Sequence, residues 1–92
     1  MYIVCMDNGI EFTKHALERI AERGASCEFI GNAVKGGVKA VGYPSPKDPD
    51  IRILTAKDDE GKYWTVIYSG NMVITVRRAH KSEEKRYDET FR

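Results

Sequence analysis

The sequence predicts an α+β domain in which two N-terminal helices precede a three-stranded antiparallel meander and a short C-terminal helix. Apolar residues recur at helical spacing in the first third of the chain, and β-branched and aromatic residues fill three short runs in the second half. The 92 residues, 41% of them apolar, fit one domain, residues 1–92, with a single small core. We therefore expect the helices to pack on one face of a small sheet.

Two short helices are expected before residue 37. Thr13 is a suitable N-cap for the first, and Gly24 supplies a left-handed C-terminal stop. The apolar face between them consists of Ala16, Leu17, Ile20 and Ala21. Ser26 can cap the second helix, and Gly36 with Gly37 ends it. Its apolar stripe consists of Phe29, Ile30, Ala33 and Val34.

The second half of the chain has the pattern of a meander. Residues 36–50 are rich in glycine and proline and predict a loop, with at most a brief extended piece at 38–41. Three strand-like runs follow: Ile51–Ala56, Tyr63–Tyr68 and Met72–Arg77. The breaks at 57–61 and 69–71 have the length and chemistry of hairpin turns. Ser82 can then cap a short final helix.

The charge of the chain is balanced overall and uneven locally. With 15 basic and 14 acidic side chains, the net charge is +1. This excludes a protein that binds any nucleic acid through a large overall positive charge. Basic side chains nevertheless crowd one segment: Arg77, Arg78, His80, Lys81, Lys85 and Arg86. Such a patch can bind phosphate even in a nearly neutral protein.

The sequence contains no pattern that predicts a membrane span, a secretion signal, a cofactor or a metal. Its apolar runs are too short to cross a bilayer, and the N-terminus lacks the pattern of a signal peptide, so we expect a cytoplasmic protein with reduced Cys5 and Cys27. Those cysteines with His15 and His80 lack the paired spacing of zinc motifs. No phosphate-binding loop or dinucleotide fingerprint is present.

The first helix carries a row of cationic side chains on its outer face. His15, Arg19 and Arg23 are four residues apart and share one side of the helix. The positive helix N-terminus and Arg19 disfavour the imidazolium form of His15, and a neutral imidazole can act as a general base. The anion that the arginines would bind could be a carboxylate of the sheet, a structural role, or a phosphate, a functional one.

Both ends of the chain resemble known bacterial families. "FTKHALERIAERGAS" resembles the start of a family of small domains of unknown function, through Phe12, Thr13, His15, Ala16, Arg19, Arg23 and Gly24. "VITVRRAHKSEEKRYDE" is similar to the tail of BrnT-type toxins, through Arg77, Arg78, Ala79, Arg86 and Tyr87. The resemblance implies the fold shared by RelE, barnase and colicin-type ribonucleases.

The resemblance implies a toxin-like endoribonuclease that cleaves RNA without a metal, by attack of the 2′-hydroxyl on the adjacent phosphate. His15 would be the base, Arg19 and Arg77 would stabilise the phosphate, and Tyr87 or His80 would supply the acid or a stacking surface. The remaining residues expected to bind RNA are Arg23, Arg78, Lys81, Lys85 and Arg86. A cognate antitoxin or immunity protein is the expected partner, and the oligomeric state stays open.

Two other readings of the same residues remain open. The first is a catalytically inactive RNA- or protein-binding module; the second is an interaction protein whose arginines pair with acids of the domain itself. An enzyme requires His15, Arg19 and Arg77 to converge on one groove. Tyr87 is as consistent with packing on the sheet as with RNA contact, and Tyr43 could stack a base. Trp64 is expected in the core.

Overall fold

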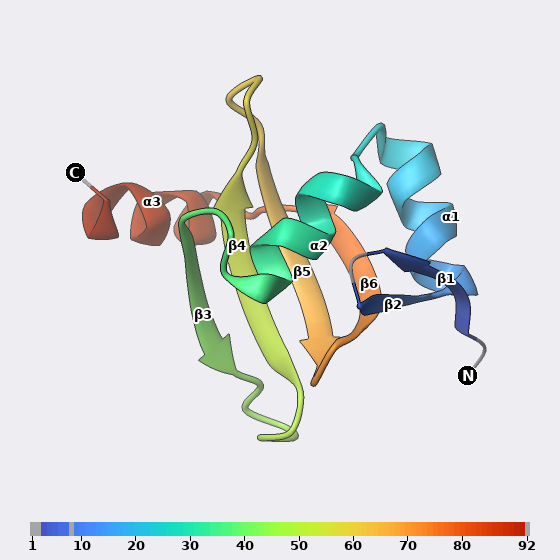
Figure 1. The fold of residues 1–92 in the computed structure, drawn as a ribbon. Helices are drawn as coiled ribbons and strands as arrows, with labels where there is room; N and C mark the ends of the chain where they lie inside the picture. The colour runs from blue at the N-terminus through green and yellow to red at the C-terminus, as the bar shows by residue number, and fades with distance from the viewer. Residues whose placement is uncertain (1–2, 8, 92) are drawn as a thin grey trace.

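The computed structural model describes the backbone of residues 3–7 and residues 9–91 in full (Figure 1). Its elements are β1 (Ile3–Asp7), β2 (Ile10–Thr13), α1 (Lys14–Arg23), α2 (Cys27–Lys35), β3 (Ala40–Pro44), β4 (Arg52–Lys57), β5 (Tyr63–Ser69), β6 (Met72–Arg78) and α3 (Lys81–Thr90). The six strands form one sheet in the order β1-β2-β6-β5-β4-β3. β2 pairs in parallel with β6, and the other neighbours pair antiparallel.

The predicted architecture is wrong, although the structure is α+β. The chain begins with a β-hairpin rather than a helix, and three strands join the meander to make a mixed sheet. The hairpin was missed because β2 is only four residues long and its pairing with β6 joins segments about sixty residues apart. β3 was missed because Gly42 and Pro44 lower strand propensity, which an edge strand tolerates. The C-terminal helix is ten residues long, as is α1.

One sheet face carries the core, and α1 and α2 pack against it. Phe12, Trp64 and Val76 are almost completely buried there, which confirms the prediction for Trp64. α1 lies along β6, and α2 crosses the sheet with Ile30 and Ala33 buried (Figure 1). Apolar stripes on both helices therefore close this face.

The predicted ends of α1 and α2 are confirmed. The Thr13 hydroxyl accepts a hydrogen bond from the Ala16 N–H at 3.0 Å, and Ser26 caps α2 in the same way. Gly24 ends α1 with a φ of 73°, a left-handed conformation that glycine adopts without steric cost. Local sequence signals are therefore sufficient to predict where α1 and α2 begin and end.

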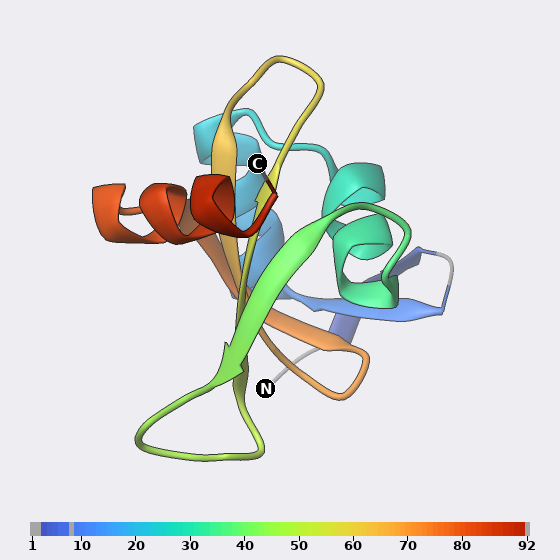
Figure 2. The ribbon, with the colours of Figure 1, turned by 90° about the vertical axis from the view of Figure 1, so that its left-hand side faces the viewer.

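The third helix lies on the opposite side of the sheet from α2 (Figure 2). The expectation that all helices share one face is therefore wrong. The expected cap is also wrong: the N-cap is His80 rather than Ser82, so α3 begins at Lys81. The helix contacts β3 and β4, and Glu83 joins it to β5 and β6.

Only part of this second face is covered. α3 crosses one end of it, and no other helix of the described chain lies over the rest (Figures 1 and 2). Four register partners run across the uncovered part, from β3 to β6, and all are half-buried: Tyr43, Ile53, Ile67 and Thr75. We call these four residues the sheet row. None of the described helices is both long and apolar enough to cross a membrane.

Candidate functional site

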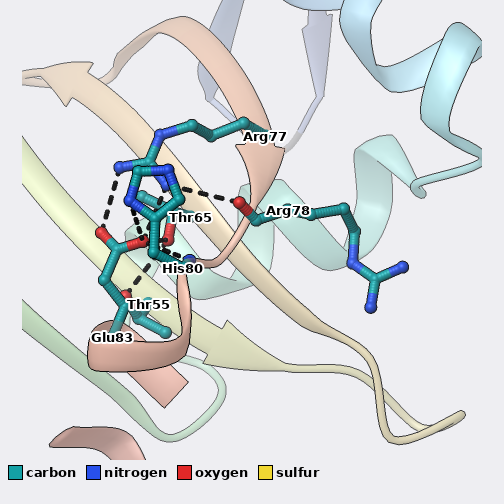
Figure 3. A network of polar contacts seen from close by, with 6 residues as sticks. All are labelled: Thr55, Thr65, Arg77, Arg78, His80 and Glu83. Carbon is teal, nitrogen blue, oxygen red and sulfur yellow. Dashed lines mark hydrogen bonds and ion pairs between the residues drawn. The ribbon is translucent and has the colours of Figure 1, made fainter. Parts of the chain in front are cut away.

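A buried carboxylate fixes the first turn of α3 to the sheet (Figure 3). Glu83 is 8% exposed, and its Oε1 accepts hydrogen bonds from Arg77 Nη1 at 2.7 Å, Thr65 Oγ1 at 3.0 Å and the His80 backbone N–H at 2.8 Å. Its Oε2 accepts a second bond from Arg77, through Nη2 at 3.1 Å. Thr55 Oγ1 lies 3.3 Å from Thr65 Oγ1. These five residues form the Glu83 hub.

The hub keeps Glu83 ionised at neutral pH. Burial alone would raise the pKa of this carboxyl, but hydrogen bonds from Arg77, the His80 backbone and Thr65 outweigh burial and hold the pKa below its ordinary value. Both terminal nitrogens of Arg77 are engaged by the same carboxylate. Arg77, predicted to stabilise a reacting phosphate, is thus held by an acid of its own chain.

A cluster of aromatic rings attaches the rest of α3. Tyr87 packs edge-on against Tyr63, with ring centroids 5.7 Å apart, and its centroid lies 4.8 Å from that of Phe91. The Tyr63 hydroxyl donates to Asp88 Oδ1 at 2.7 Å, and this bond is the main reason that the pKa of Tyr63 rises to about 12. The ring of Tyr87, predicted to be an acid or a stacking surface, therefore has a structural role between two other rings.

Cationic side chains from distant segments lie over exposed or half-exposed rings on this side of the sheet. The Arg86 guanidinium carbon is 4.8 Å from the ring centroid of Tyr43, which ends the sheet row at β3. Lys57 lies 5.2 Å from the ring centroid of Tyr63. Such pairs are cation–π interactions. The first pair places positive charge beside the sheet row, whereas Lys57 lies beyond Thr55, at the other end of β4.

The cationic row of α1 is separate from these groups. His15 and Arg23 are exposed, and Arg19 forms an ion pair with Glu22 of the same helix. Within residues 9–91, no hydrogen bond, ion pair or ring contact joins the row to Arg77 or Tyr87. Arg19 and Arg77 therefore face different carboxylates, and the structure does not bring the predicted catalytic residues into direct contact.

The residues of the basic C-terminal segment lie in different places on the structure. Arg78 lies on the core side of the sheet, 5.2 Å from the Trp64 ring centroid, and Figure 3 shows it extending away from Arg77. His80 is exposed, with Nδ1 3.8 Å from Glu83 Oε1. Lys81 and Lys85 are also exposed, and Lys85 lies 4.0 Å from Glu89. Among the described residues of this segment that were predicted to bind RNA, only Arg86 borders the sheet row.

Sequence reasoning missed three important features of this surface. Glu83 was not singled out, although an acid three residues after a helix N-cap is a recognised capping signal. Ile53 and Ile67 were assigned to strands but not to a surface, and alternation along β4 and β5 places them opposite the core. Lys57 was read as part of a turn.

A cleft elsewhere in the molecule does not suit a phosphate. It has a volume of about 430 Å³ and lies between the start of α2 and the β4–β5 hairpin. Its lining includes four acids: Glu28, Asp58, Asp59 and Glu60. Asp58 is committed to the hairpin, where its Oδ2 accepts from Trp64 Nε1 at 2.8 Å. Across the described residues, no three His, Cys, Asp or Glu side chains gather into a possible metal site.

No protein-family model, no curated protein and no solved structure matches the chain. The resemblance to ribonuclease toxins therefore stays a prediction.

Proposed function

We propose that this protein is a single-stranded RNA-binding module and that the sheet row with Arg86 is its binding surface. The observation that carries the proposal is the Arg86 guanidinium, 4.8 Å over the ring of Tyr43, at one end of an uncovered row of apolar side chains. Proteins bind unpaired bases by stacking them on such surfaces and bind the backbone with adjacent cations.

The shape of the row fits unpaired bases. It crosses four adjacent strands, which at about 4.8 Å per strand gives a length of roughly 14 Å. Tyr43 offers an aromatic face, and Ile53 and Ile67 offer apolar contact. A four-stranded surface of this kind can accept two or three bases. A duplex keeps its base faces stacked inside and gains nothing from the row.

The charges on this side favour a weak and moderately salt-dependent complex. Arg86 and Lys57 are positive, but α3 itself carries four acids and three basic residues. Few phosphates can therefore be neutralised, and the slope of log affinity against log salt should be shallow. Base stacking, rather than bulk charge, would then supply most of the affinity.

Binding is supported better than cleavage by the geometry. Arg77 is held by Glu83 and Arg19 by Glu22, so neither guanidinium is directed at an empty position beside His15. Metal-independent cleavage, the cognate antitoxin and the cytoplasmic location stay predictions. RNA incubated in EDTA with the wild-type protein and with His15→Ala tests the first of these: fragments made by the wild type alone would establish an endoribonuclease.

The binding proposal is tested by the fluorescence anisotropy of a labelled single-stranded RNA of mixed sequence. Tyr43→Ala should weaken binding about tenfold, since stacking contributes about 1–3 kcal/mol per base, and Arg86→Gln should weaken it severalfold. Arg52→Gln is the matched control, because Arg52 alternates with Ile53 and lies on the other face of β4. Equal losses in Arg52→Gln and Arg86→Gln, or a duplex bound as tightly as the single strand, would contradict the proposal.

A further inference from the structure

The Glu83 hub has the composition of an anion-binding site. Two of its donors belong to the sheet: the fork of Arg77 and the hydroxyl of Thr65. The third, the His80 backbone N–H, lies at the start of α3. A guanidinium fork binds phosphate oxygens in the same bidentate way as it binds a carboxylate. The anion that occupies the site in this structure is the carboxylate of α3.

The helix that supplies this carboxylate is attached differently from the other two. Glu83 is the single described residue of α3 that is buried, whereas α1 and α2 each bury apolar side chains. The remaining attachments include the ring cluster of Tyr63, Tyr87 and Phe91, the bond from Tyr63 to Asp88 and the cation–π contact of Arg86 with Tyr43. Displacement of α3 would thus leave the core on the other side of the sheet closed.

The hub also adjoins the proposed RNA surface. Arg77 and Thr75 are two residues apart on β6, as are Thr65 and Ile67 on β5, so each pair points to the same face. Two residues along a strand span about 7 Å. Arg77 and Thr65 therefore form the next row beside the sheet row, beneath α3.

We propose that Arg77 and Thr65 form a second phosphate-binding site, covered by α3, in which the Glu83 carboxylate takes the place of the phosphate. The ligand exchanges with the carboxylate, and the first turn of α3 moves away from the sheet as the phosphate binds. That the phosphate belongs to an RNA backbone rests on the proposed function. The site itself can be tested with inorganic phosphate alone.

The direct test is an NMR titration of the full chain with inorganic phosphate, observing the Arg77 side-chain Nε–H signal. In Glu83→Gln, the competing charge is gone, and the signal should shift saturably, with an affinity at least tenfold higher than in the wild type. Glu84→Gln, the same change on the neighbouring residue, should behave like the wild type. No shift in Glu83→Gln, or equal shifts in the two variants, would overturn the inference.

A parallel measurement with single-stranded RNA separates this inference from the proposed function. Glu83→Gln should bind RNA several times more tightly than the wild type, and the slope of log affinity against log salt should steepen by about 0.7, the value for one more phosphate contact. Arg77→Gln in the same background should remove both effects. Phosphate binding without RNA binding would refute the proposed function but support the phosphate site at Arg77 and Thr65. RNA binding unaffected by Glu83→Gln refutes the covered site and leaves the proposed function.

A second variant covers the case in which Glu83→Gln does not fold. Tyr63→Phe removes only the hydroxyl that bonds Asp88 and leaves Glu83, Arg77 and Thr65 in place. It should loosen α3, seen as faster amide hydrogen exchange, and give a phosphate affinity above that of the wild type. Faster exchange in α3 without any gain in phosphate affinity would contradict the inference.

Discussion

Helices α2 and α3 have almost the same length and lie on opposite faces of one sheet, yet they are attached by different interactions. The buried residues of α2 are Ile30, Gly31 and Ala33, and the side chains of Ile30 and Ala33 form part of the core. The buried residue of α3 is Glu83, which is held by hydrogen bonds and an ion pair. Apolar burial closes one face, whereas α3 is attached to the other by a buried carboxylate and by half-buried rings.

The difference matters because the two kinds of attachment respond to different conditions. Burying an isoleucine side chain contributes about 1.5–3 kcal/mol whatever the pH, and no solute competes for it directly. A buried ion pair loses much of its electrostatic attraction to the cost of desolvating its two charges, and another anion can replace the acid. α3 is therefore the part of the molecule that protons or phosphate can release.

Mutation in the two helices should have unequal effects on stability. Ile30→Ala, at a fully buried position, should lower the free energy of unfolding by about 2–5 kcal/mol. Tyr87→Ala, at a half-buried position of α3, should cost less, because its ring packs against Tyr63 and Phe91, which are themselves only half-buried. Urea unfolding of both variants measures this difference. An equal or larger loss in Tyr87→Ala would mean that α3 is as firmly anchored as α2.

Acid should release α3 before α2. The folded-state pKa of Glu83 is lowered from an ordinary value of 4.5, so its contribution to stability is present above 4.5 and is lost as the pH falls through the lowered pKa. Amide hydrogen exchange followed downward through this range should show α3 losing protection first. Glu83→Gln should abolish the pH dependence in α3. If α2 and α3 lost protection at the same pH in both the wild type and Glu83→Gln, the two helices would not differ in their response to acid.

The hydrogen bond from Tyr63 to Asp88, which also attaches α3 to the sheet, should make a smaller contribution to stability. The pKa of Tyr63 is raised from 10.0 to about 12, so the neutral phenol stabilises the fold fully below pH 10, and this contribution is lost as the pH rises towards 12. Ultraviolet titration should show a late phenolate that is absent from Tyr63→Phe and appears earlier in Asp88→Asn. An unchanged late phenolate in Asp88→Asn would show that Asp88 does not hold Tyr63.

Local structure was predicted from the sequence better than architecture. The caps of α1 and α2 depend on single residues near the helix ends, such as Thr13 and Gly24, so the sequence is sufficient there. The pairing of β2 with β6 joins the two ends of the chain and has no local signal. The same holds for α3, whose side of the sheet depends on the contact of Glu83 with Thr65 and Arg77.

The candidate site was predicted in part. The sequence shows a basic C-terminal segment, and Arg86 lies at the proposed surface with Tyr43. Arg77 and Arg78 were grouped together although neighbours on a strand point to opposite faces, a rule that could have separated them. The ion pair between Glu83 and Arg77 could not be predicted, because it forms only when α3 packs against the sheet.

Binding of single-stranded RNA to the uncovered sheet face can be observed by NMR chemical-shift mapping with an unlabelled RNA. Resonances of Tyr43, Ile53 and Ile67 should shift with a common affinity, and those of the α1 row, His15, Arg19 and Arg23, should stay in place. Shifts gathered on the α1 row instead, or no shifts at high RNA concentration, would show that the uncovered sheet face does not bind RNA.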